Sequence, residues 1–216
     1  LDAIAPALVA RRSGEWRERG VALDGGRFAW AERPLADAAL ATAAASRFPP
    51  SIDYAGEINL AAEALVAQVA ASVAEGALLV VDYGFPRAEF YHPQRAEGTL
   101  MAHYRHRALT DVFRWPGLAD ITAHVDFTAI AEAGARGGLA VAGYTTQAAY
   151  LLGAGILDRL LDVGEPGSIE FVRASTALQT LTSPAEMGDL FKVLALARSP
   201  GIRWRGFAIA DKSHTL

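Results

Sequence analysis

The chain has 216 residues, a formal net charge of −4 and no cysteine, with 52% apolar and 20% charged residues. The acidic balance argues against a general nucleic-acid-binding protein, because such proteins carry an excess of Lys and Arg. The lack of cysteine excludes disulfides, thiolate metal sites and cysteine nucleophiles. No apolar run reaches the roughly 20 residues that a membrane-spanning helix needs.

The amino-terminal quarter predicts a β meander followed by a helix. Asp24-Gly25-Gly26 lies between two alternating segments, and Asp-Gly in that position is a strong hairpin signal. An alanine-rich stretch then predicts a helix. The expected segments are strands over Ala7–Arg12, Glu15–Leu23 and Arg27–Glu32, and a helix over Leu35–Ser46.

The next segment predicts a helix over Glu57–Glu75, with Glu57 placed at its start, where a carboxylate favours the helix dipole. It leads into Ala77–Val81, an apolar run expected to be a strand buried on both faces, as in parallel sheets. Asp82, Tyr83 and Gly84 follow its carboxyl end, where open α/β sheets bind ligands. The helix-to-strand step indicates a wound α/β sheet.

Residues 85–120 show little regular pattern, which favours a long functional loop. This region and the residues just after it hold much of the polar chemistry, including His103, Tyr104, His106, Arg107, Asp120, His124 and Asp126. A histidine and carboxylate metal site is one interpretation. The histidine spacing does not fit a helical pair, so structural or substrate-contacting histidines are the favoured interpretation. Asp126 is expected to cap a helix that ends near Arg136.

The carboxyl-terminal third predicts further helices and strands. Ser183-Pro184-Ala185-Glu186 has the pattern of a capping box that opens a short helix. The other expected elements are a strand over Leu139–Tyr144, a helix capped by Thr145 or Thr146, helices over Ile156–Val163 and Ser168–Leu181, and a terminal hairpin of Phe191–Ala197 with Arg203–Ala210. The whole pattern is α/β with an antiparallel end.

Several long runs of uncommon residues carry a family resemblance. They are Leu1–Ala3, Trp16–Arg19, Gly76–Gly84, Tyr91–Arg95, Gly98–Arg107, Pro116–Phe127, Gly143–Gln147 and Ser183–Leu194. Together they resemble the carboxyl-terminal part of the MidA-like family of S-adenosylmethionine-dependent methyltransferases. That family includes the mitochondrial arginine methyltransferase needed for assembling respiratory complex I.

The resemblance implies a class I, Rossmann-like methyltransferase fold, here the carboxyl-terminal half of the sheet with a small antiparallel β insertion. Residues 1–216 would form a partial methyltransferase domain, and residues 7–50 a family insertion within it. The glycine-rich cofactor loop of the family lies outside this sequence. The resemblance therefore implies either that more chain precedes Leu1 or that the chain cannot methylate alone.

The implied reaction is methyl transfer from S-adenosyl-L-methionine to a protein arginine guanidinium, whose planar fork suits carboxylates. No metal is expected. The residues assigned by the resemblance are Asp2, Asp82 and His106 for catalysis, Tyr83, Tyr104, Arg107, His124 and Asp126 for substrate binding, and Asp2, Asp82 and Gly84 for cofactor binding.

The implied partners are a protein substrate, such as a respiratory complex I subunit, and a second copy in a homodimer, with no nucleic acid and no membrane span. The expected location is the bacterial cytoplasm, or the mitochondrial matrix for a eukaryotic relative. Two rival interpretations remain open. One is a non-catalytic binding or assembly module on the same fold, and the other is a metal-dependent hydrolase built on the histidines.

Overall fold

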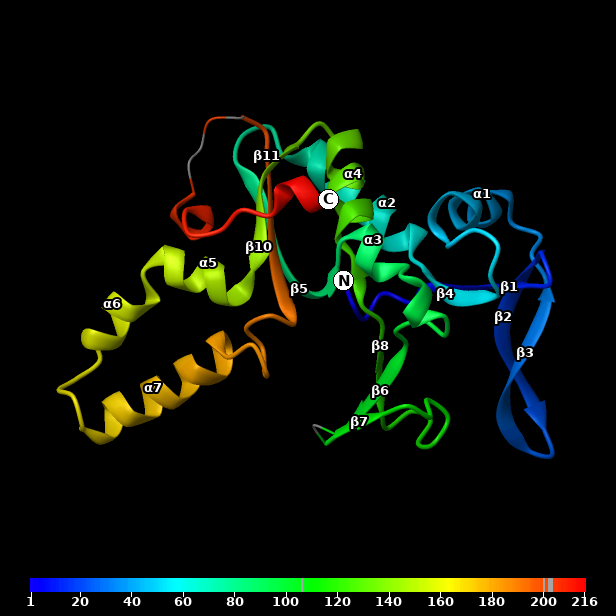
Figure 1. The fold of residues 1–216 in the computed structure, drawn as a ribbon, viewed down its shortest axis with the longest axis horizontal. Coiled ribbons are helices and arrows are strands. Elements are labelled where there is room, and N and C mark those ends of the chain that lie inside the picture. The colour runs from blue at the N-terminus through cyan, green and yellow to red at the C-terminus, as the bar shows by residue number, and fades with distance from the viewer. Residues whose placement is uncertain (106, 200, 202–203) are drawn as a thin grey trace. The chain divides into compact units, whose positions relative to one another are not determined.

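The computed structural model describes residues 1–105, 107–199, 201 and 204–216 (Figure 1). The chain divides into two compact units, each of which is described by itself. Unit 1 comprises Leu1–Leu65 and Arg87–Asp126, and unit 2 comprises Val66–Pro86 and Phe127–Leu216. Helices and strands interleave along the chain, so the predicted α/β class is confirmed. No helix in the described part of the chain is long and apolar enough to span a membrane.

Unit 1 holds a four-stranded antiparallel sheet in the order β3-β2-β1-β4. Its strands are β1 (Ala7–Arg12), β2 (Glu15–Asp24), β3 (Arg27–Pro34) and β4 (Tyr54–Ile58). The predicted meander is confirmed. Gly25 and Gly26 both have positive φ angles, 54° and 81°, which explains why the β2–β3 turn carries two glycines.

Helix α1 (Ala38–Arg47) follows the meander and begins slightly later than predicted. Asp37 sets its start, because its Oδ1 accepts hydrogen bonds from the backbone N–H groups of Ala39, at 2.8 Å, and Leu40, at 3.0 Å. Arg47 in the last turn makes a bidentate ion pair with the buried Glu63, at 2.7 and 3.2 Å. The pair ties α1 to the start of α2 within unit 1.

The predicted helix over Glu57–Glu75 is wrong at its amino-terminal end. Tyr54–Ile58 forms β4, every residue of which is buried, and α2 spans Leu60–Ser72. Asn59 separates them, and its Oδ1 accepts a hydrogen bond from the N–H of Ala62 at 3.0 Å. β4 pairs with β1, more than 40 residues away in sequence. A long-range pairing of this kind leaves no trace in local periodicity, which is why Ile58 fitted a helical stripe.

Residues 85–120 are not the long irregular loop that was predicted. They contain α3 (Arg87–Phe90), the 3-10 helix η1 (Pro93–Arg95), and a sheet of β6 (Met101–Tyr104), β7 (Arg107–Leu109) and β8 (Asp120–Thr122) in the order β7-β6-β8. The short strand β9 (Val125–Asp126) closes unit 1. Strands of two to four residues are too short to show an alternating pattern.

Within unit 2, β11 (Phe191–Ala197) lies between β10 (Ala140–Thr146) and β5 (Ala77–Phe85) and pairs antiparallel with both. The prediction that β5 is buried on both faces is wrong, because Leu79 is 41% and Val81 50% exposed. The predicted terminal hairpin of Phe191–Ala197 with Arg203–Ala210 is also wrong for the residues that the structure describes, because β11 pairs with β10 and β5 instead. Residues 205–207 form the 3-10 helix η2, and Arg203 lies outside the described residues.

The helices of unit 2 agree with the predicted pattern except near residue 183. The Thr146 cap is confirmed, because its hydroxyl accepts a hydrogen bond from Ala149 N–H at 3.3 Å. The predicted capping box at Ser183 is wrong, because Ser183 ends α7, donating its N–H to the Gln179 carbonyl at 2.8 Å. The helices are α4 (Phe127–Arg136), α5 (Gln147–Ala154), α6 (Ile156–Leu161), α7 (Ile169–Thr182) and the 3-10 helix η3 (Ser213–Thr215).

One arginine closes the ends of two helices in unit 2. Arg198, just after β11, donates to the carbonyls of Ala70 at 2.9 Å and Val73 at 2.8 Å, at the end of α2. It also donates to the carbonyls of Gly137 at 3.3 Å and Gly138 at 2.8 Å, after α4. The Ala70 carbonyl also accepts a hydrogen bond from the Val73 N–H at 3.3 Å, so the guanidinium adds a second donor there and supplies a charged donor to the carbonyls that follow the two helices.

Candidate functional site

A cavity of about 200 Å³ lies in unit 1, beside the β1–β4 sheet. Its wall is mixed, with apolar residues beside four residues that bring charge or an aromatic ring: Arg19 from β2, Trp30 from β3, Glu57 from β4, and Glu97. The other lining residues are Leu8, Val9, Ala55, Gly56, Leu100, Thr110 and Val112. A mixed wall of this kind, with a few placed polar groups among apolar ones, is typical of ligand sites.

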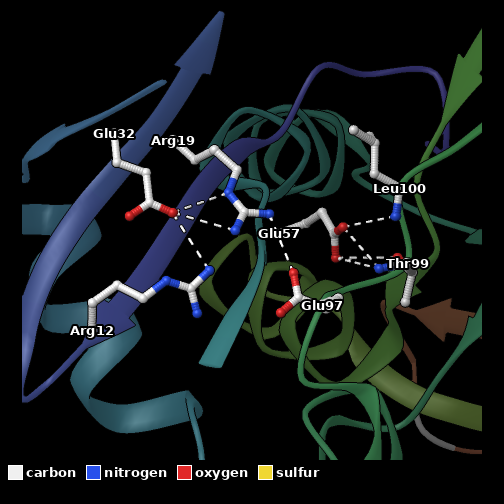
Figure 2. A network of polar contacts seen from close by, with 7 residues as sticks. All are labelled: Arg12, Arg19, Glu32, Glu57, Glu97, Thr99 and Leu100. Carbon is white, nitrogen blue, oxygen red and sulfur yellow. Dashed lines mark hydrogen bonds and ion pairs between the residues drawn. The ribbon is translucent and has the colours of Figure 1, made fainter. Parts of the chain in front are cut away.

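Glu57 is fixed by the segment that precedes β6. Only 3% of the residue is exposed. Its Oε1 accepts hydrogen bonds from the N–H groups of Thr99 and Leu100, both at 2.8 Å. Its Oε2 accepts from the Thr99 N–H at 3.1 Å and from the Thr99 hydroxyl at 3.2 Å. We call this arrangement the Glu57 latch, and Figure 2 shows its hydrogen bonds.

Gly98 is required by the latch. Its φ angle is +80°, and a Cβ atom at this position would lie 2.5 Å from Glu57 Oε1. Any other residue would therefore be strained and would also strike the carboxylate. Burial raises the pKa of Glu57 above its ordinary value, and the N–H groups of Thr99 and Leu100 act in the opposite direction.

Sequence reasoning missed the role of Glu57 and placed it at a helix start. Its partners are 42 and 43 residues away in the chain, so no local spacing links them. One available signal was that Glu57 is the single charged residue of the segment Tyr54–Ile58.

A network of charged side chains lies beside the latch (Figure 2). The Arg19 guanidinium donates to Glu32 Oε1 from two nitrogens, each at 3.3 Å, and a third nitrogen lies 3.6 Å from Glu97. Arg12 reaches the same Glu32 oxygen at 3.5 Å. Arg19 also lies over the Trp30 ring, 5.8 Å from its centroid. One guanidinium thus contacts both a carboxylate and an aromatic face.

One predicted site residue, His124, joins the latch through its backbone, and a second, Asp2, bonds to the residue next to it. The N–H of His124 donates to the Thr99 hydroxyl at 3.0 Å, so His124 connects to Glu57 through Thr99. The N–H of Ala123, one residue earlier, donates to the carbonyl of Asp2 at 3.2 Å. Asp2 and His124 are therefore brought close together in unit 1, although the sequence separates them by more than 120 residues.

The other predicted residues of unit 1 lie elsewhere. The Asp126 side chain is 8% exposed, and its Oδ2 accepts a hydrogen bond from Arg87 Nε at 3.5 Å. Burial and the nearby Asp126 raise the pKa of the Tyr91 hydroxyl. Tyr104 and Arg107 are cross-strand partners in β6 and β7, and the Tyr104 ring stacks at 4.4 Å from that of Trp115. His106 lies outside the described residues.

Asp82, Tyr83 and Gly84 lie in unit 2, near the end of β5. Asp82 is 6% exposed, and its Oδ1 accepts a hydrogen bond from the N–H of Tyr83 at 2.9 Å. The Tyr83 ring meets Phe191 edge-on at 5.5 Å. Lys192, which sequence reasoning missed, is buried and lies opposite Asp82 in the β5–β11 register. Its pairing depends on long-range strand register, which local pattern does not reveal.

Metal ligation was one interpretation of the histidines. Among the residues that the structure describes, no three His, Asp or Glu side chains are grouped so as to hold a metal ion.

Comparison with known proteins identifies a family. The family model Methyltransf_28, described as "Putative S-adenosyl-L-methionine-dependent methyltransferase", matches residues 1–145. Mouse (Mus musculus) protein arginine methyltransferase NDUFAF7, mitochondrial, is 36% identical over 125 residues, covering 56% of this chain and 26% of the relative. The Danio rerio protein of the same name is 29% identical over 218 residues, covering 94% of this chain and 47% of the relative.

A solved structure matches over the whole chain. It is the crystal structure of a COG1565 superfamily member from Burkholderia thailandensis bound to S-adenosyl-homocysteine. It has a TM-score of 0.93 and 49% sequence identity, and the match covers 100% of this chain and 56% of that one. A second structure from the same organism, of a COG1565 superfamily protein, has a TM-score of 0.92 and 48% identity. This chain spans 26% to 47% of the length of the two named relatives.

Proposed function

Because the chain belongs to the Methyltransf_28 family of S-adenosyl-L-methionine-dependent methyltransferases, we propose that it takes part in methyl transfer from S-adenosyl-L-methionine to an arginine of a protein substrate. The observation that supports this proposal most directly is the match to the structure bound to S-adenosyl-homocysteine, at 49% identity over the full chain. The arginine acceptor is supported by the names of the NDUFAF7 relatives.

The proposed fold is the carboxyl-terminal part of a class I, Rossmann-like methyltransferase domain. Residues 1–216 would belong to that domain, and residues 7–50 would be an insertion within it. In this proposal β5 of unit 2 corresponds to the fifth strand of the methyltransferase sheet, and β10 and β11 correspond to its final hairpin, in which β11 runs antiparallel to both neighbours. The β1–β3 meander of unit 1 corresponds to the insertion.

The residues of unit 2 fit a role beside the cofactor. Asp82 is a buried carboxylate near the end of β5, with an oxygen already oriented by the Tyr83 N–H. A carboxylate held in this way accepts hydrogen bonds from hydroxyl or ammonium groups, and S-adenosyl-L-methionine carries both. The cofactor, when bound, supplies a methyl group on a sulfonium. Gly84 lies two residues after Asp82, and because glycine has no side chain it leaves space at the proposed site.

The proposed substrate side uses carboxylates to hold the guanidinium. Bidentate pairing would fix its plane and present one nitrogen lone pair to the methyl group. Asp2 and Asp82 are each proposed as a carboxylate of this kind, and His106, Tyr104, Arg107, His124 and Asp126 are proposed as residues that shape the substrate side. The nitrogen–methyl bond would form as the methyl–sulfur bond breaks, with S-adenosyl-homocysteine as the leaving group. The methylated nitrogen would lose a proton to solvent, which leaves a methylated guanidinium with a single positive charge.

Calorimetric titration with S-adenosyl-homocysteine tests the proposal. We would titrate this chain, the full Burkholderia protein, and the Burkholderia protein cut to the region that matches this chain. We expect the full Burkholderia protein to bind S-adenosyl-homocysteine. Asp82→Asn should weaken any binding by this chain, and the equivalent substitution should weaken binding by the Burkholderia protein. Binding unaffected by the Asn change would remove Asp82 from the site.

Three finer expectations remain predictions. They are a respiratory complex I subunit as the substrate, a homodimer, and a location in the bacterial cytoplasm or the mitochondrial matrix. Sedimentation of the purified chain tests the dimer, and methylation assays on candidate protein substrates test the acceptor.

A further inference from the structure

The outer half of the β2–β3 hairpin is a two-stranded ribbon. β1 pairs with β2 only from Glu15 to Arg19, so within the described chain Gly20–Asp24 of β2 has β3 as its single neighbouring strand. Figure 1 shows the two strands side by side, in blue. A two-stranded hairpin by itself is at best marginally stable in water. This half of the hairpin can therefore gain stability from a further strand.

One face of this ribbon is apolar. Residues directly opposite each other in an antiparallel pair lie on the same face, and the register pairs Val21 with Trp30 and Leu23 with Phe28. Phe113 covers part of this face, with its ring centroid 4.7 Å from that of Trp30 and 6.3 Å from that of Phe28. The four residues of the ribbon nevertheless stay between 41% and 72% exposed. A cluster of exposed apolar side chains is typical of a protein contact surface.

The outer edge of β3 is open. β3 is the last strand of its sheet, and its register with β2 is unbroken from the turn, where Asp24 lies opposite Arg27. The pair that closes a two-residue turn exchanges hydrogen bonds, and such pairs alternate along a hairpin with pairs that do not. The N–H and C=O groups of Phe28 and Trp30 therefore point to the open edge, where no described residue hydrogen-bonds to them. A long edge of this kind can pair with a strand of another chain.

We propose that β3 pairs antiparallel with β3 of a second copy of this chain, about a two-fold axis at Ala29. Phe28 of each copy then lies opposite Trp30 of the other, and the outer half of the hairpin becomes part of a four-stranded sheet. The pairing joins two apolar rows, each made of Leu23 and Phe28 from one copy and Trp30 and Val21 from the other. A single axis fills the open edges of both copies. The proposal assigns an interface to the homodimer expected above and does not depend on methyl transfer.

The charges and rings of β3 select this register for a second copy. An axis at Trp30 would place Arg27 opposite Arg33 of the other copy twice, and like charges directly opposite each other destabilise a strand pair. An axis at Ala31 would place each Trp30 opposite a glutamate, with no aromatic pair. The axis at Ala29 places no two like charges opposite each other and makes two aromatic pairs, which are among the favourable cross-strand pairs.

Single cysteines test the register, because the chain has no cysteine of its own. The variants are Ala29→Cys, Ala31→Cys and Ala22→Cys, all on the face of the ribbon opposite the apolar one. In the proposed pairing the two copies of residue 29 meet at the axis, whereas the copies of residue 31 and those of residue 22 lie about 13–14 Å apart. A disulfide needs Cα atoms within about 7 Å. Under mild oxidation we expect a covalent dimer from Ala29→Cys alone.

Sedimentation measures the pairing without a cross-link. A strand pair with two short apolar rows is a small interface, so we expect the unaltered chain to dimerise with a dissociation constant on the order of 10–100 µM. Phe28→Glu should raise this constant at least about tenfold, because it removes both aromatic pairs of the dimer. The matched control Leu23→Glu, on the same face but in β2, should change the constant less than about threefold.

Several results would overturn the proposal. One is a chain that stays monomeric up to about 0.5 mM, which would leave the edge to a different protein. Stronger cross-linking at residue 22 would place the contact on β2, and equal cross-linking of all three variants would mean chance collisions. A dimer that Phe28→Glu and Leu23→Glu weaken equally would lie on another surface. Because none of these measurements uses a cofactor, a monomeric chain beside a positive S-adenosyl-homocysteine titration removes the β3 interface alone and leaves the proposed function standing.

Discussion

The Glu57 latch gives a prediction in which the geometry sets the size of the effect. Both carboxylate oxygens of Glu57 accept from the N–H of Thr99, at 2.8 and 3.1 Å. The change Glu57→Gln replaces one oxygen with an NH₂ group. With the NH₂ group at the Oε2 position, the Thr99 hydroxyl loses its acceptor; with the NH₂ group at the Oε1 position, the Leu100 N–H loses its acceptor. The Thr99 N–H keeps one oxygen in either case, and one buried donor loses its hydrogen bond.

The expected cost follows from that loss. A buried donor left without its partner costs about 1–3 kcal/mol, so we expect Glu57→Gln to lower the free energy of unfolding by about 2 kcal/mol at pH 5. For a chain of this length, about 2 kcal/mol corresponds to a fall in Tm of about 4–8 °C. Glu15→Gln, at an exposed glutamate of the same unit, is expected to change stability by less than about 0.5 kcal/mol.

Urea unfolding followed by circular dichroism measures the difference, and amide hydrogen exchange locates it. Exchange at Thr99 and Leu100 should be faster in the Glu57→Gln protein than in the unaltered one, while exchange in β10 and β11 should keep its rate. If Glu57→Gln and Glu15→Gln unfold at the same urea concentration, the latch contributes nothing and the reasoning is refuted.

The same pair of proteins tests the direction of the pKa of Glu57. Burial raises this pKa in the folded chain, so the folded state favours the protonated carboxyl group. Glu57 then stabilises the fold most below its ordinary pKa of about 4.3, and this contribution is lost as pH rises through the raised pKa. Glutamine does not titrate. The stability difference between the two proteins should therefore shrink from pH 5 to pH 8, and a difference that widens would show that the N–H donors outweigh burial.

Two further predictions concern backbone and helix ends. Gly98→Ala should lower the free energy of unfolding by about 2–3 kcal/mol, because it adds backbone strain at positive φ and a clash with Glu57. The control Gly25→Ala, at positive φ in open space, should lower it by only about 1 kcal/mol. Equal midpoints of the two variants in thermal unfolding would contradict this. Arg198→Met should lower the free energy of unfolding by about 2–4 kcal/mol, because four carbonyls at helix ends lose a charged donor. The control Arg173→Met, on an exposed face of α7, should change it by less than about 0.5 kcal/mol. Urea unfolding measures both.

The parts of the fold that the sequence predicted well are those set by neighbouring residues. The β1–β3 meander was predictable because its turns need the backbone freedom of Gly25 and Gly26. The Thr146 cap was predictable because a hydroxyl satisfies an N–H three residues later. In each case the deciding interaction spans only a few residues, so the local sequence pattern predicts it.

The parts that failed are those decided by distant partners. Glu57 fitted a helix because Ile58 continued an apolar stripe, but pairing of β4 with β1 places both in a strand. Leu79 and Val81 suggested a strand buried on both faces, but both residues are exposed, so one face of β5 is not buried. The sequence named Asp82, His124 and Asp2 as site residues, and their roles stay predictions. It could not reveal that Lys192 lies opposite Asp82 or that Glu57 accepts hydrogen bonds from Thr99.

The latch also accounts for a run that the family resemblance had already marked as unusual. Gly98 has to lack a side chain because a carboxylate occupies that space, and Thr99 has to carry a hydroxyl because it bonds to both Glu57 and His124. Leu100 places its N–H on Glu57 and its side chain at the cavity wall. The stability of this segment and the shape of the cavity wall therefore depend on the same residues.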